Sequence, residues 1–76
     1  MSAFTRAPSA HFWISQIFSS QAACNGGIVR RKIASVVEYA SVALLKAEVI
    51  RRGFHMVESG DQFVIFCNPG DIKIVA

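Results

Sequence analysis

The sequence predicts an α+β fold in which an N-terminal helix and a basic helical segment pack on a three-stranded antiparallel β-meander. Two observations indicate this class: apolar side chains recur at helical spacing before residue 53, and they alternate in short, turn-bounded runs after it. With 76 residues, 53% of them hydrophobic and 17% charged, the chain has the length of one small domain and is too apolar for a disordered protein. We expect a loose N-terminal arm over residues 1–8 and a single domain over residues 9–76.

The first helix is predicted over residues 10–24, with Ser9 as its N-cap. Asn25-Gly26-Gly27 then ends the helix, because glycine adopts left-handed backbone at little cost. The next run, residues 28–33, is short, β-branched and basic, which fits an extended segment or an edge strand.

The second helical region carries two start signals. An S-x-x-E pattern that begins at Ser35 has the form of a capping box, and Ser41 is another candidate cap. Residues 36–52 therefore form either one helix or two helices in a helix-turn-helix layout. Gly53 is expected to end this region, with Phe54 folding back on the helix as in a Schellman motif.

Turn signals fix the register of the expected meander. With Ser59-Gly60 as a two-residue turn, Met56 pairs with Phe63. With Asn68-Pro69-Gly70-Asp71 as a second turn, residues 72–75 form the third strand. One face of this sheet is then apolar throughout and is expected to pack on the helices.

The opposite face of the sheet is also more apolar than a water-facing surface needs to be. We expect it to be covered by the first helix, by a second copy or another protein, or by nucleic acid stacked on its single aromatic ring. The candidate interface residues on this face are His55, Val57, Val64, Phe66 and Val75.

The positive charge is concentrated in the middle of the chain. Residues 30–52 hold six basic residues against two acidic ones, a formal charge of +4, whereas residues 53–76 carry −2. Such a basic region suits an anionic partner, DNA or RNA, or else serves as a solvated surface. The candidate nucleic-acid-binding residues are Arg30, Arg31, Lys32, Lys46, Arg51 and Arg52.

The cysteines and the apolar runs bear on whether the chain is a metal-binding, redox, membrane or secreted protein. Cys24 and Cys67 stand alone, without the spacing of a zinc site or a redox pair, so we expect buried thiols, with a disulfide between them left open. The longest apolar run, residues 63–67, is too short to cross a bilayer, and polar residues interrupt the N-terminal stretch that a signal peptide would need. We expect a cytoplasmic protein with no membrane span, no metal and no cofactor.

Three family resemblances follow from these patterns. The order helix, basic extended segment, helix, helix, hairpin resembles a winged helix, with residues 42–52 as recognition helix and residues 58–62 as the wing. From Ser41 onward, the glycine-phenylalanine pair after the helix, the glycine hairpin and the N-P-G-D turn resemble HicA-type toxins, which are related to double-stranded-RNA-binding domains. The histidine that carries catalysis in that family is absent after Gly60, so this resemblance implies RNA binding without nuclease activity.

The third resemblance covers residues 12–75. The stretches Phe12-Trp13, Gly26-Gly27-Ile28-Val29-Arg30-Arg31, Arg51-Arg52-Gly53-Phe54-His55 and residues 62–68 are similar to a family of short uncharacterised bacterial proteins. Some members carry the name phosphoribosylanthranilate isomerase. That enzyme is a (β/α)₈ barrel of roughly 200 residues or more, longer than this chain.

The functional expectation is a small non-enzymatic protein that binds nucleic acid or regulates through its basic helix surface. The alternative is a protein-interaction module, or a homodimer, that uses the second sheet face. An enzyme would depend on His55 beside Glu58 or Cys67, and the expected register places His55 and Cys67 on opposite faces. The isomerase is a remote alternative by family name only.

Overall fold

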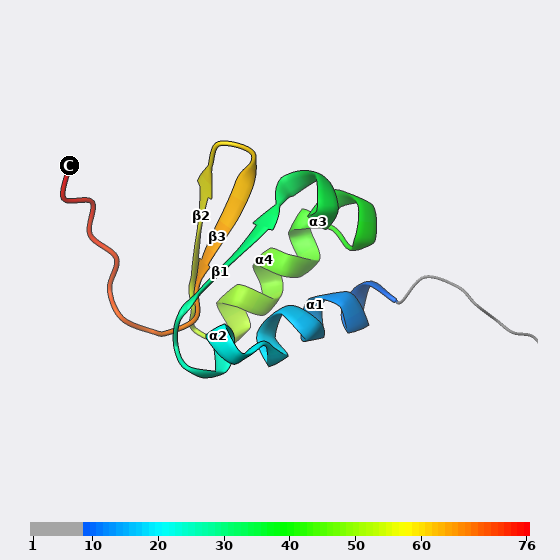
Figure 1. The fold of residues 1–76 in the computed structure, drawn as a ribbon, viewed down its shortest axis with the longest axis horizontal. Coiled ribbons are helices and arrows are strands. Elements are labelled where there is room, and N and C mark those ends of the chain that lie inside the picture. Colours follow the sequence, from blue (N-terminus) through cyan, green and yellow to red (C-terminus); the bar gives the residue numbers. More distant parts are fainter. Residues whose placement is uncertain (1–8) are drawn as a thin grey trace, which may run out of the picture.

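The computed structural model describes residues 9–76 and shows, within them, four helices on one side of a three-stranded sheet (Figure 1). In chain order the elements are α1 (Ala10–Ser19), α2 (Gln21–Cys24), β1 (Ile28–Lys32), α3 (Ile33–Tyr39), α4 (Val42–Arg51), β2 (His55–Ser59) and β3 (Gln62–Phe66). The predicted α+β class, with an antiparallel three-stranded sheet packed on helices, is confirmed. The arm predicted for residues 1–8 lies outside the described residues.

The sheet has the strand order β1-β3-β2, so its third strand is β1 and not the C-terminal segment. The prediction of a strand over residues 72–75 was wrong. The reason is that β3 has both of its edges filled, by β1 and by β2. The side chain of Asn68 also directs the chain elsewhere: its amide donates to the Gly26 carbonyl at 3.1 Å, and its oxygen accepts from the Gly70 N–H at 3.0 Å.

The β2–β3 hairpin turns at Gly60-Asp61, one residue later than the sequence suggested. Ser59 pairs with Gln62 and Met56 with Ile65, instead of the predicted Met56–Phe63 pair. Gly60 has a φ of +61°, as the first position of a type II′ turn requires. Because the slip moves each partner by two residues, every side chain of the hairpin keeps its predicted face.

The helices begin and end at side-chain and glycine caps. The predicted caps Ser9 and Ser41 accept hydrogen bonds from the N–H groups of Phe12 and Leu44, at 3.1 and 3.0 Å. At the end of α4 the N–H groups of Gly53 and Phe54 donate to the carbonyls of Ile50 and Val49, which is the predicted Schellman motif. Gly53 adopts the left-handed φ of +72° that this motif needs.

Two helix boundaries differ from the prediction. The first helix breaks at Ser20, which is extended and caps α2 by accepting from the Ala23 N–H. The capping box at Ser35 does not form, because α3 already begins at Ile33, directly after β1. There the Ile33 N–H donates to the Asp61 carbonyl at 2.9 Å, so the hairpin turn satisfies the first backbone donor of α3. The second helical region is thus two helices, α3 and α4.

The core lies between the helices and one face of the sheet. Its most deeply buried large side chains are Ile17 of α1, Val36 of α3, Leu45 of α4 and Ile65 of β3. The first helix was a candidate cover for the opposite face, but α1 buries Ile14, Ile17 and Phe18 in this core instead. None of the helices among residues 9–76 has the length and apolar character needed to cross a bilayer.

Candidate nucleic-acid interface

The face of the sheet that points away from the helices is the candidate site, and we call it the open face. Strand pairing arranges its side chains in three rows across β1, β3 and β2. The rows are Ile28–Phe66–His55, Arg30–Val64–Val57 and Lys32–Gln62–Ser59. Within the described part of the chain, no helix lies on this side (Figure 1).

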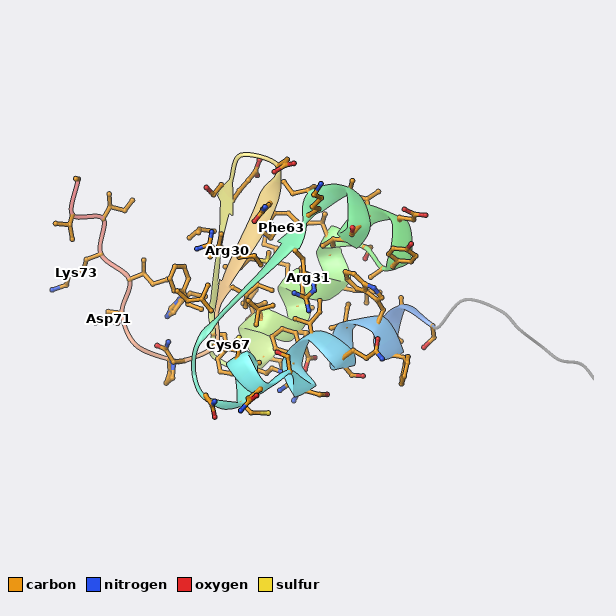
Figure 2. All side chains as sticks on the ribbon, in the orientation of Figure 1. Arg30, Arg31, Phe63, Cys67, Asp71 and Lys73 are labelled. Carbon is orange, nitrogen blue, oxygen red and sulfur yellow. The ribbon has the colours of Figure 1, made fainter. Side chains whose placement is uncertain are left out.

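The basic edge of the open face comes from β1. Arg30 and Lys32 are both exposed, and two residues along one strand separates their Cα atoms by about 7 Å. Arg31 lies between them in sequence but points to the helix side, where it is half-buried and its Nη1 donates to the Arg30 carbonyl at 2.7 Å. Figure 2 shows Arg30 and Arg31 on opposite sides of the strand. The predicted basic triplet is therefore divided between the two faces.

An aromatic ring and a histidine occupy the row at the other end of the open face. Phe66 is half-buried and lies between Ile28 and His55 across the strands. The His55 Nε2 atom is covered and has no hydrogen-bond partner among residues 9–76. A covered polar atom without a partner costs free energy.

Four of the five predicted interface residues share the open face: His55, Val57, Val64 and Phe66. Val75 does not, because the segment that carries it is not part of the sheet and its side chain is 94% exposed. Ile28, Arg30 and Lys32 were not expected here. The β-branched, basic run over residues 28–33 was the available signal, and it indicated an edge strand without saying which strand it joins.

The remaining candidate cations lie on α4, away from the open face. Arg51 and Arg52 both bind the Glu48 carboxylate: the Nε of Arg51 donates to Oε1 at 3.0 Å and the Nε of Arg52 to Oε2 at 2.6 Å. The hydrogen bonds from Arg51 and then Arg52 lower the pKa of Glu48 from its ordinary 4.5 to about 2. The guanidinium of Arg52 also lies 4.6 Å from the centroid of the Phe18 ring.

The cleft beside these arginines lies between α1 and α4 and has a volume of about 360 Å³. It is lined by His11, Ile14, Ser15, Leu44, Ala47, Glu48, Arg51 and Arg52. Lys46 is exposed, but five residues along a helix turn it about 140° away from Arg51. The six predicted cations are thus not one surface. Two lie on the open face, two hold Glu48, and Lys46 and Arg31 point elsewhere.

Neither cysteine pairs with the other. Cys24 and Cys67 are free thiols, and Cys24 is exposed where a buried thiol was expected. Cys67 is buried on the helix side, where desolvation raises the pKa of its thiol. Over residues 9–76 there is no group of three or more His, Cys, Asp and Glu side chains that could hold a metal ion.

Comparison of the chain with protein-family models, with curated proteins and with solved structures gave no match. The open face is therefore interpreted from its own residues.

Proposed function

We propose that this protein binds single-stranded nucleic acid on the open face of its sheet. The observation that carries the proposal is that Arg30 and Lys32, which have no salt-bridge partner among residues 9–76, share one sheet face with the Phe66 ring. Proteins that bind single strands combine cations that contact the phosphates with aromatic side chains on which bases stack.

The remaining side chains of the open face suit the same role. Gln62 offers an amide beside Lys32 that can form hydrogen bonds to bases or sugars. Val64 in the middle row is buried by its neighbours and forms an apolar floor. His55 and Cys67 lie on opposite faces of the sheet, which favours a binding role over catalysis.

Duplex DNA is the target that a winged-helix layout implies. The order α1, β1, α3, α4, β2, β3 with strand order β1-β3-β2 supports such a layout. However, its recognition helix would be α4, where Arg51 and Arg52 are held by Glu48, and its wing ends in the acidic Asp61. The cations of the open face are therefore more available to phosphates than those of α4. Duplex DNA serves as the comparison ligand in the test.

The test is a fluorescence-anisotropy titration of the full chain with labelled single-stranded RNA, single-stranded DNA and duplex DNA of equal length. We expect a single strand to bind more tightly than the duplex. Phe66→Leu keeps an apolar side chain but removes the stacking ring, and it is expected to weaken single-strand binding about tenfold. Phe12→Leu makes the same change at an exposed ring on α1 and should leave the affinity unchanged. Equal effects of the two variants would contradict the proposal, as would preferential binding of the duplex.

A protein partner on the open face is the second candidate, favoured by the exposed apolar side chains of Ile28 and Val57. Val57→Ser separates the two functions, because it removes an apolar contact without adding a charge to the row of Arg30, and it leaves Arg30, Lys32 and Phe66 in place. Loss of a protein partner with unchanged single-strand affinity would favour this candidate. The free thiols of Cys24 and Cys67 suit a reducing compartment such as the cytoplasm for either function.

A further inference from the structure

The C-terminal segment, residues 71–76, has the sequence of a strand but pairs with none of the strands among residues 9–76. Residues 71–74 alternate charged and β-branched side chains, and Ile74 and Val75 are 91% and 94% exposed. In Figure 1 it leaves the end of β3 and runs away from the sheet. An extended apolar segment of this kind is suited to adding to the free edge of a sheet.

The sheet offers two free edges, and the ladder shows which backbone groups point outward. The Cys67 N–H donates to the Gly27 carbonyl and the Ile33 N–H to the Asp61 carbonyl. The backbone N–H and C=O groups of the odd-numbered residues of β3 therefore point toward β1. Because these backbone groups point to alternate sides along a strand, those of the even-numbered residues of β3 point toward β2. The outward groups of β2 are then those of Met56 and Glu58. Outside the sheet ladder they have no backbone hydrogen bond in the described part of the chain.

The two edges differ in how well they are protected. The β1 edge carries Arg30, Arg31 and Lys32 in succession, and a run of cations discourages the approach of another strand. The β2 edge carries a single charge, Glu58. The β2 edge is therefore the better acceptor.

The segment of the same chain is poorly placed to use this edge. The segment follows β3, whose last residue, Phe66, pairs with His55 at the start of β2. To add to the outer edge of β2 in the same chain, the segment would have to run parallel to β2 after a link of only four residues. Parallel neighbours in one sheet normally need a crossover of a dozen residues or more. A second copy of the chain can instead present its segment antiparallel.

We propose that the C-terminal segment of one copy pairs antiparallel with β2 of a second copy, and that the exchange is reciprocal, forming a two-fold dimer. Charge selects the register: Lys73 lies opposite Glu58, which puts Val75 opposite Met56 and Ile74 opposite Val57. In this register Ile74 and Val75 each meet an apolar residue of β2, while Ile72 lies opposite Ser59 and Ala76 opposite His55. The registers shifted by one or two residues toward the start of the segment place Ile72 or Asp71 opposite Glu58.

The experiment measures the mass of the full chain by light scattering over a range of protein concentrations. The unaltered chain is expected to form a dimer, and Ile74→Asp to be monomeric. Lys73→Glu and Glu58→Lys should each weaken the dimer about tenfold. A symmetric dimer contains the Lys73–Glu58 pair twice, and each substitution turns both attractions into repulsions. The double variant Glu58→Lys with Lys73→Glu should restore it. Glu38→Lys, an exposed reversal on α3, is the matched control and should change nothing.

Each alternative result overturns the proposal. A monomer at every concentration would show that no exchange occurs. A dimer that survives Ile74→Asp would use another surface, and a double variant that fails to recover would exclude the Glu58–Lys73 register. All three outcomes are independent of nucleic-acid binding, which is measured on the open face.

Discussion

At the scale of single residues, Glu48 decides how much of the positive charge on α4 is available to a ligand. Its carboxylate accepts hydrogen bonds from both Arg51 and Arg52. Arg52 is further held over the Phe18 ring. A phosphate would have to compete with Glu48 for these guanidinium groups, whereas Arg30 and Lys32 have no acidic partner among the salt bridges of residues 9–76.

The depressed pKa of Glu48 predicts a pH-dependent contribution to stability. Because folding lowers this pKa from 4.5 to about 2, the contribution is complete above pH 4.5 and is lost as the pH falls toward 2. Allowing for solvent screening of a largely exposed pair, Glu48→Gln should cost about 1 kcal/mol at neutral pH. Urea unfolding of the variant and the unaltered chain at pH 7 and pH 3 measures this. The difference in their free energies of unfolding should be about half as large at pH 3 as at pH 7. A difference that does not change with pH would show that the carboxylate charge is irrelevant.

At the scale of elements, the caps explain where sequence patterns suffice and where they do not. Ser9, Ser41 and Gly53 act on donors and acceptors within a few residues, and all three caps were predicted. Ser35 has the same local pattern, yet the start of α3 is fixed by Asp61, which lies far along the chain. The identity of the third strand likewise depends on pairing between β1 and β3, which local turn signals do not specify.

The two serines give a direct test at this scale. Ser41→Ala removes the acceptor for the Leu44 N–H and should destabilise the protein by about 1 kcal/mol. Ser35→Ala lies inside α3, caps nothing there, and introduces the better helix former, so it should be neutral or slightly stabilising. Thermal or urea unfolding of both variants measures this. Equal losses from the two substitutions would mean that Ser35 caps α3 after all.

At the scale of the whole molecule, one layer of helices covers one face of the sheet and leaves the other for a ligand. The periodicity of the sequence predicted which hairpin residues belong to each face, because a two-residue slip in register does not exchange them. It left residues 28–33 as an extended segment or an edge strand without a pairing partner, and so it assigned the basic residues to a helix surface. Strand pairing places Arg30 and Lys32 on the same sheet face as Phe66, and that arrangement became visible only in the folded structure.

The two-layer core predicts that substitutions at two positions of α4 change the free energy of unfolding by very different amounts. Leu45 is fully buried, so Leu45→Ala should cost about 3 kcal/mol, a large part of the stability of a domain this small. Ile50 lies on the same helix but is exposed, and Ile50→Ala should change the free energy of unfolding by less than about 0.5 kcal/mol. Urea unfolding measures both. A large loss at Ile50 would indicate that α4 packs against a further surface.

The salt dependence of single-strand binding tests the central claim most directly. Anisotropy titrations over a range of salt concentrations give the slope of log affinity against log salt, which counts the phosphates that the protein neutralises. The double variant Arg30→Gln with Lys32→Gln should reduce this slope by about 1.4 units, while the matched variant Lys46→Gln with Arg51→Gln on α4 should leave it unchanged. The opposite pattern, a slope that falls only when α4 is altered, would contradict the open face as the nucleic-acid site.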